Sequence, residues 1–216
     1  ELSGGELALV DEESGVLWRW HPEVGGRIAS AALSTLRRPV QCAQRGELLF
    51  VACFGEEEHP GRSGIALINT SSWTMVRERQ LGSTHVHHAY PLEGDALLFA
   101  DVGDPWVSPA ILGGVFLVES MLSDRASPPS RIGPPMHARA MALVPARGSA
   151  SRGQGSWRGG GLPARFTMHV ITQEPLGEPT KIVSLQLIAR EGWRGGATVS
   201  IESTLQLPSP ARPSDG

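Results

Sequence analysis

The sequence predicts an all-β fold built from repeated four-stranded units, and two observations carry this prediction. The chain of 216 residues contains 26 Gly and 17 Pro, so turns are frequent and long helices are disfavoured. Short apolar runs of β type recur at intervals of about 40 to 50 residues. Four short antiparallel strands at that spacing are the pattern of a propeller blade. We therefore expect a β-propeller with about four four-stranded blades.

The repeat consists of several kinds of run. One kind is introduced by Gly and an acidic residue and begins at positions 5, 46 and 94. A second kind begins with Gly at positions 15, 64 and 113, and a third precedes the first kind at residues 39–43, 85–90 and 137–143. Residues 27–33 and 75–81 supply the fourth strand of two units. This order of runs predicts blades whose strands follow one another in sequence.

Blade boundaries follow from the spacing. We expect blades at about residues 1–36, 37–82, 83–134 and 135–207. A Gly-, Ser- and Arg-rich loop insertion at 146–161 stretches the last blade, and a Pro-rich tail follows at 208–216. Because an open ring would expose an apolar sheet edge, we expect that blades are missing and that the chain is a fragment. Kelch and WD40 repeats share this period, but the chain has no Trp-Asp dipeptide and a single tyrosine.

Composition excludes several functions. The 19 basic and 22 acidic residues offer no broad cationic surface for nucleic acid or anionic lipid. No apolar run reaches the roughly 18 residues that span a bilayer, so we expect a soluble, cytoplasmic protein. Hairpin pairing would place Cys42 opposite Leu49 or Phe50 and not Cys53, which predicts two free thiols in a reducing compartment. The spacing of the cysteines predicts no zinc or redox site, and no cofactor is expected.

Three of the seven histidines lie within four residues, at His85, His87 and His88. Strand alternation places His85 and His87 on one face and His88 on the other. The innermost strands of a propeller line its central channel, where a neutral imidazole could act as a general base or bind substrate. The alternatives are a polar strand start that bonds to neighbouring loops, or a metal pair whose third ligand the spacing does not supply.

Three further polar residues occupy comparable places in the repeat. Arg139 lies between small residues in the next innermost strand, where its guanidinium could bind a carboxylate or phosphate through two hydrogen bonds. A salt bridge between blades is the alternative for Arg139. Glu174 follows the apolar run 168–173, and Asp101 ends another strand. Glu174 could instead be a solvated turn residue before Pro175, and Asp101 could instead accept hydrogen bonds from turn amides.

Four segments resemble motifs of the lactonase family of seven-bladed β-propellers. This family includes the propeller-type 6-phosphogluconolactonases and the carboxy-cis,cis-muconate cyclases. The similar segments occur in the family's order, at residues 49–55, 85–103, 135–142 and 169–174. The resemblance covers about residues 36–207 and implies a seven-bladed ring with blades absent on both sides of this chain.

The resemblance also implies a function and a site. The implied activity is a lactonase that opens a sugar-acid lactone, such as 6-phosphogluconolactone, by general-base activation of water. The implied partner is a small anionic lactone or carboxylate. The site residues are His85, His87, Arg139 and Glu174 for catalysis, and His88, Asp101 and Arg139 for substrate binding.

Two alternatives stay open at this point. A muconate cycloisomerase would use the same residues to bind a diacid and protonate carbon. A non-catalytic binding propeller would keep the fold without the chemistry. The chain departs from the family motifs at Ala140, where the family usually has His, and at Gln173, where it has Asn.

Overall fold

The computed structural model describes residues 2, 5–56, 62–83, 85–92, 95–104, 111–123, 128–145, 165–172, 180–189 and 197–206. These residues form fifteen β-strands and no α-helix, so the prediction of an all-β chain is confirmed in this part. None of the described elements is a helix that could cross a membrane. The predicted loop insertion and Pro-rich tail lie outside the described residues. The thiols of Cys42 and Cys53 are free, as expected.

The strands form four antiparallel sheets in which neighbours in sequence are neighbours in space. The first sheet holds β1 (Leu7–Asp11), β2 (Val16–His21) and β3 (Gly26–Ala32). The second holds β4 (Pro39–Arg45), β5 (Leu48–Cys53), β6 (Gly64–Asn69) and β7 (Thr74–Gln80). The third holds β8 (Val86–Pro91), β9 (Leu97–Asp104), β10 (Ile111–Val118) and β11 (Ser130–Ile132). The fourth holds β12 (Ala138–Pro145), β13 (Arg165–Thr172), β14 (Lys181–Ala189) and β15 (Ala197–Gln206).

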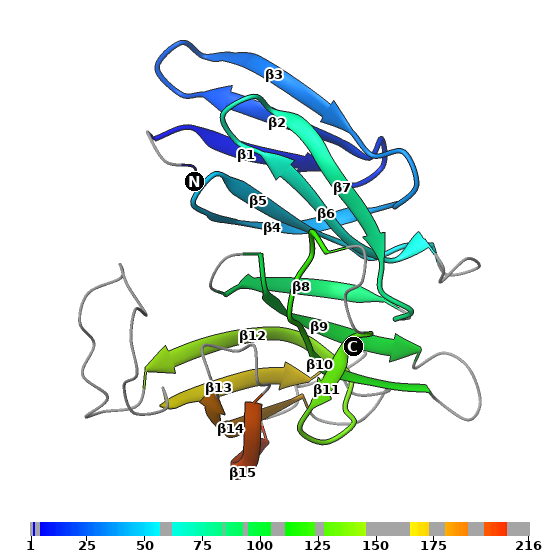
Figure 1. Cartoon of the computed structure of the whole chain (residues 1–216), viewed down its shortest axis with the longest axis vertical. Helices are drawn as coiled ribbons and strands as arrows, with labels where there is room; N and C mark the ends of the chain where they lie inside the picture. Colours follow the sequence, from blue (N-terminus) through cyan, green and yellow to red (C-terminus); the bar gives the residue numbers. More distant parts are fainter. Residues whose placement is uncertain are drawn as a thin grey trace, which may run out of the picture.

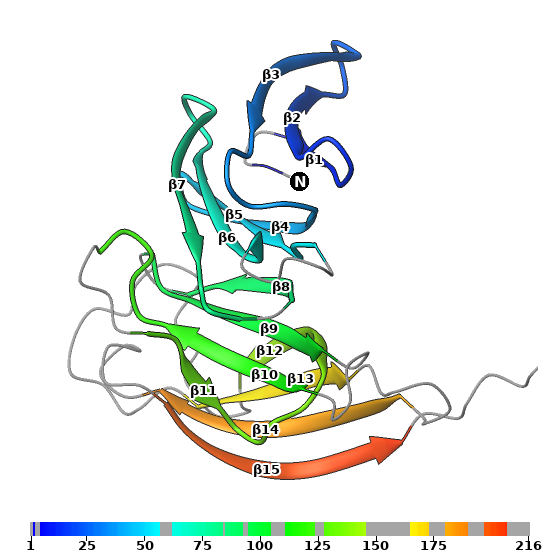
Figure 2. The ribbon, with the colours of Figure 1, turned by 90° about the vertical axis from the view of Figure 1, so that its right-hand side faces the viewer.

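The sheets follow one another along the long axis, from the first sheet (blue) to the fourth (yellow to red), as Figures 1 and 2 show. The first strands of the later three sheets are neighbours: β8 contacts both β4 and β12, and β4 also contacts β1. Residues at the start of these strands are therefore brought together although they are far apart in sequence.

Apolar side chains fill the space between successive sheets. Phe50 of β5 and Phe99 of β9 belong to the core between the second and third sheets, and Leu98 of β9 belongs to the next core. Because β5 and β9 are covered on both faces, they read as continuous apolar runs without alternation. This burial explains why the runs after Gly and an acid are apolar throughout.

Two details of the strand count differ from the prediction. The first sheet has three strands instead of four, because β1, β2 and β3 correspond to the second, third and fourth strands of the other sheets. The last strand of the third sheet, β11, has only three residues, which is too short for a periodic pattern to reveal.

The hairpin between β4 and β5 also differs in register. Cys42 pairs with Val51 and not with Leu49 or Phe50, because the turn between the strands holds only two residues. The expectation that Cys42 would not face Cys53 is confirmed.

The same irregularity opens the first strand of three sheets. The pairing shifts by one residue between Pro39 and Gln41, between Val86 and His88, and between Ala138 and Ala140. A bulge of this kind leaves its extra residue out of the ladder and turns that side chain away from the regular direction. The residues at the three bulges are Val40, His87 and Arg139.

Candidate functional site

The residue just before the first strand of each later sheet reaches back to the preceding sheet. These residues are Arg38, His85 and His137. Arg38 donates to Glu12 Oε1 from Nε at 2.9 Å and from Nη2 at 2.6 Å. The Nδ1 atoms of His85 and His137 bond instead to backbone carbonyls, those of Phe54 and Val102. The repeated position therefore connects successive sheets.

His85, a predicted catalytic residue, makes such a connection between sheets through its buried side chain. Its side chain is 1% exposed, and its ring stacks on Phe54 with centroids 4.4 Å apart. Its Nδ1–H donates to the Phe54 carbonyl oxygen at 3.1 Å, because a carbonyl can only accept. This is the geometry of the alternative interpretation, in which a histidine at a strand start bonds to a neighbouring loop.

Asp101, a predicted substrate-binding residue, is likewise engaged with backbone. Its Oδ1 accepts hydrogen bonds from the amides of His85 at 2.9 Å and Gly103 at 2.8 Å, and the residue is 2% exposed. A buried carboxylate is stable when backbone amides satisfy it in this way. Asp101 thus positions His85 and the end of β9.

His87 differs from His85 because the bulge of β8 presents it to the neighbouring sheets. The ring is half-buried and meets Phe54 edge-on, with centroids 6.0 Å apart. Burial lowers the pKa of His87, and the guanidinium of Arg139 lowers it further. The carboxylate of Glu12 acts in the opposite direction. The net shift is downward, so the imidazole is neutral near pH 7.

Two other predicted site residues interact electrostatically with His87: Arg139 of β12 and His88 of β8. Arg139 is exposed at the bulge of β12, where its charge acts on His87. His88 is half-buried, and burial, followed by the charge of His87, lowers its pKa. Glu174 lies outside the described residues. From the predicted set, the described part therefore brings His87 and Arg139 together, and His88 acts only with its neighbour His87.

Sequence reasoning missed Phe54 and Glu12, which act on His87, and Arg38, which contacts both of them. Phe54 separates His85 from His87, and the guanidinium of Arg38 lies 5.1 Å from the centroid of its ring. Glu12 binds Arg38 and acts on His87. Glu12 and Phe54 directly follow β1 and β5, and Arg38 directly precedes β4. A search of the residues at these strand ends would have revealed all three.

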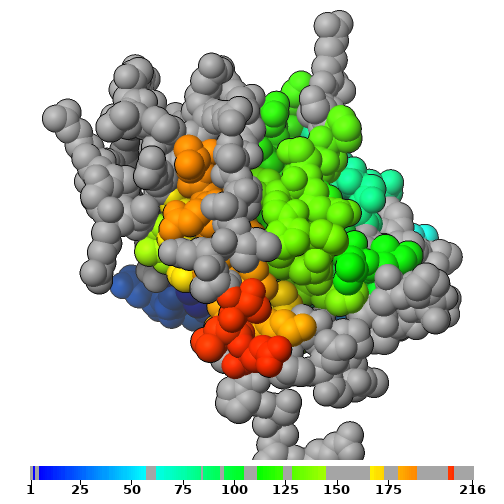
Figure 3. All heavy atoms as spheres, turned by 90° about the horizontal axis from the view of Figure 1, so that it is seen from below, coloured from blue at the N-terminus to red at the C-terminus, as the bar shows by residue number. Residues whose placement is uncertain are grey.

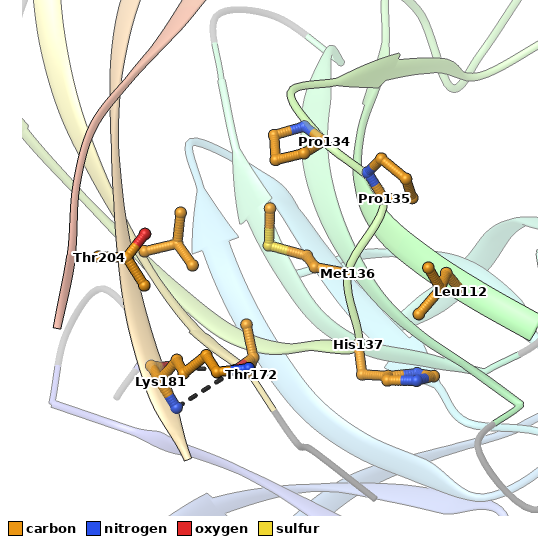
Figure 4. A pocket seen from close by; sticks show the side chains of 9 residues that line it. Leu112, Pro134, Pro135, Met136, His137, Thr172, Lys181 and Thr204 are labelled. Atoms are coloured by element: carbon orange, nitrogen blue, oxygen red, sulfur yellow. Dashed lines mark hydrogen bonds between the residues drawn. The ribbon is translucent and has the colours of Figure 1, made fainter. Parts of the chain in front are cut away.

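A cavity of about 290 Å³ lies between the third and fourth sheets, and His87 is not among the residues that line it. Its lining is apolar around Met136 and Val183 and polar around Thr172 and Lys181 (Figure 4). Thr172 Oγ1 accepts from the amide of Lys181 and donates to its carbonyl, both at 3.3 Å. Across the described ranges, no three His, Cys, Asp or Glu side chains converge as a metal site would require.

Comparison with known proteins gives a likeness of fold. No protein-family model and no curated protein matches the chain. Among solved structures, the chain is similar to a hypothetical selenium-binding protein from Sulfolobus tokodaii, with a TM-score of 0.59 and 10% sequence identity. The alignment covers 93% of this chain and 45% of that protein's chain, so this chain spans less than half of its length. At this identity the likeness concerns the arrangement of the sheets.

Proposed function

We propose that the four sheets are blades of a β-propeller and that the site at their first strands opens the lactone ring of a small anionic substrate. Sequential antiparallel sheets whose first strands are neighbours support the propeller. The seven-bladed count and the cytoplasmic location stay predictions of the sequence. The free thiols of Cys42 and Cys53 support a reducing compartment.

The observation that carries the proposed activity is the pairing of a neutral His87 with the exposed cation of Arg139. A general base must be unprotonated at working pH, and the lowered pKa of His87 meets this condition. Arg139 supplies positive charge for a carboxylate or phosphate of the substrate, or for an oxyanion. The two residues occupy equivalent bulges in strands that contact each other, and the charge of Arg139 acts on His87.

The reaction then needs one water molecule and one base. His87 takes a proton from water while the water oxygen attacks the lactone carbonyl carbon, and Arg139 stabilises the negative charge on the carbonyl oxygen. The bond from that carbon to the ring oxygen breaks as the carbonyl re-forms. The imidazolium returns its proton to the departing ring oxygen, which gives a hydroxy acid and restores neutral His87.

The test is lactone opening by the full chain and by His87→Gln and Arg139→Gln. We expect His87→Gln to lower kcat/KM by about a hundredfold or more, because general-base catalysis contributes about 10²- to 10⁴-fold. Arg139→Gln should raise KM for a phosphorylated sugar lactone more than for its neutral counterpart. His21→Gln, at the end of β2, is the matched control. A loss below about threefold in His87→Gln would exclude His87 as the base.

A non-catalytic binding propeller is the second candidate, and a specific observation favours it. Two predicted participants are engaged with backbone groups: His85 bonds to the Phe54 carbonyl of the second sheet, and Asp101 accepts from the His85 amide within the third sheet. This candidate predicts that calorimetry detects an anionic hydroxy acid bound through Arg139, with no lactone opening. Unchanged ultraviolet absorbance after addition of a carboxymuconate would exclude the cycloisomerase.

A further inference from the structure

The third and fourth sheets can be compared position by position, because the bulges of β8 and β12 are equivalent. Asp101 pairs with the first residue of β8 and Thr172 with the first residue of β12, so these two residues correspond. Two residues earlier on the same strands, Phe99 corresponds to Val170. The pairing registers extend the comparison to the third and fourth strands of each sheet.

The third sheet carries large side chains at these positions, on the face that packs against the second sheet. Phe99 pairs with Phe116, and their rings stack with centroids 5.1 Å apart. The guanidinium of Arg131, which pairs with Phe116, lies 5.5 Å from the centroid of that ring. Both rings pack in the core between the second and third sheets, so that interface is filled at this level.

The fourth sheet carries smaller side chains at the same positions. Val170 pairs with Val183, and Val183 pairs with Thr204, so two valines and a threonine replace the two rings and the guanidinium. The cavity between the third and fourth sheets lies at this level, because Val183 and Thr204 line it. Its volume of about 290 Å³ is space that the smaller side chains leave open. Figure 3 shows the neighbouring surface, where the third sheet (green) lies beside β14 and β15 (orange and red).

The interface between the first and second sheets closes the same position in another way. The second sheet also has a small residue there, Ala66, but Leu36 of the linker between the sheets is fully buried in this core. The carboxylate of Glu78, which pairs with Ala66, accepts hydrogen bonds from the amides of residues 34–36 and holds the linker in place. Pro135, the corresponding linker residue before the fourth sheet, is exposed, so this linker does not fill the cavity.

The cavity combines apolar walls with a cation. Figure 4 shows Met136 of the linker facing Thr204 of β15 across the cavity. Lys181, the only lysine of the chain, lines the cavity at the position that Gly114 occupies in the third sheet. The buried ring of His137 adds a polar group to the lining. Among the described residues that line the cavity none is acidic, so the charge there favours an anion.

We propose that this cavity binds a small aromatic monocarboxylate, with its ring in the place of the phenylalanine rings of the third sheet and its carboxylate at Lys181. An apolar cavity of about 150 Å³ holds benzene, so about 290 Å³ accommodates a benzene ring with a short acid side chain. The thioether of Met136 can make favourable contacts with an aromatic ring. The ammonium of Lys181 can form a charge-assisted hydrogen bond with the carboxylate. His87 and Arg139 are not among the lining residues, so this site is separate from the proposed lactonase site.

The first measurement is isothermal titration calorimetry of the full chain with 3-phenylpropanoate, and we expect one molecule to bind per chain. The amide 3-phenylpropanamide keeps the shape without the charge. It should bind at least about tenfold more weakly, because a hydrogen bond to a charged group is stronger than one to a neutral group. Propanoate, which lacks the ring, should show no binding at the same concentrations.

Four variants locate the site. Val183→Phe restores the ring that the third sheet has at this position and should abolish binding of both aromatic ligands. Lys181→Gln should lower the affinity for 3-phenylpropanoate to that of the amide and leave the amide affinity unchanged. Val24→Phe, in the exposed β2–β3 turn, is the matched control and should bind like the parent chain. Arg139→Gln should also bind like the parent chain, whether or not the chain opens lactones, so the two proposals fail separately.

Circular dichroism and the unfolding midpoint verify that Val183→Phe is folded. If it is not, Thr204→Phe, at an exposed position of β15, narrows the cavity instead and should abolish binding. The proposal is overturned if the full chain does not bind 3-phenylpropanoate, or if the folded cavity-filling variant binds it like the parent chain. Binding that Arg139→Gln removes would place the carboxylate at the proposed lactonase site and would equally overturn the proposal.

Discussion

The imidazole of His85 lies against the ring of Phe54, with centroids 4.4 Å apart and planes inclined by 12°. The same imidazole donates a hydrogen bond to the carbonyl of Phe54. One residue before β8 is therefore bound twice to the residue that follows β5. These contacts connect the second and third sheets at the point where His87 is presented.

Removing the His85 ring should weaken this connection. We expect His85→Ala to lower the free energy of unfolding by roughly 3 kcal/mol, because a buried carbonyl loses its donor and a cavity replaces the ring. Urea denaturation followed by circular dichroism measures the change. His21→Ala, in the first sheet, is the control and should cost less than about 0.5 kcal/mol. A loss below about 1 kcal/mol in His85→Ala would contradict the structural role.

Gly103 and Gly46 both have left-handed backbone, so comparing them separates the cost of backbone strain from the cost of steric crowding. Gly103 has φ of 74° and Gly46 has φ of 57°. A Cβ at Gly103 would overlap the carbonyl oxygen of Ile111, whereas a Cβ at Gly46 meets no atom within 4 Å. We expect Gly46→Ala to cost about 1 to 2 kcal/mol and Gly103→Ala more than about 3 kcal/mol. Equal unfolding midpoints for the two variants would contradict this assignment.

His87 should make stability depend on pH in the acidic range. The pKa of His87 is lowered in the folded chain. Between the folded and unfolded pKa values, the unfolded chain therefore binds a proton that the folded chain does not bind. Stability should be retained above pH of about 6.5 and should fall as pH decreases from there through the lower folded pKa. His87→Gln should flatten this slope in a series of urea titrations, leaving the part due to His88. An unchanged slope would mean that His87 is not held neutral.

Glu78 should give a separate dependence at lower pH. Burial alone would raise its pKa, but hydrogen bonds from residues 34–36 outweigh burial and lower the pKa. Stability from this carboxylate should be present above pH of about 4.5 and lost as pH falls through the lower folded pKa.

The matching variant is Glu78→Gln, which keeps the shape of the side chain. It should lose about 1 kcal/mol near neutral pH, a modest value because the group is partly exposed, and its loss on acidification should be smaller than that of the parent chain. Glu13→Gln, in an exposed turn, should behave like the parent chain. If Glu78→Gln unfolds in acid as the parent chain does, the stability that residues 34–36 gain from Glu78 does not depend on its charge.

The sequence predicts a strand most clearly where both faces of that strand are buried, because its apolar run is then continuous. The strands β5, β9 and β10 were predicted because both faces of each are covered, and the three-residue β11 was missed because it is too short to show a period. The candidate histidines were found as a cluster, but their separate roles were not. His85 and His87 differ through the bulge after Val86, and strict alternation along the strand cannot represent a bulge.

The sequence by itself predicted an all-β fold, strands that recur in units and free thiols, from composition, apolar spacing and short hairpins, and the described part of the chain agrees. Only the tertiary structure decided which polar residues act between sheets. Phe54 of the second sheet contacts His87, Glu12 of the first sheet acts on it, and the neutrality of His87 depends on burial and on Arg139 of the next sheet. Burial and charge proximity of this kind arise between distant segments, so no local pattern contains them.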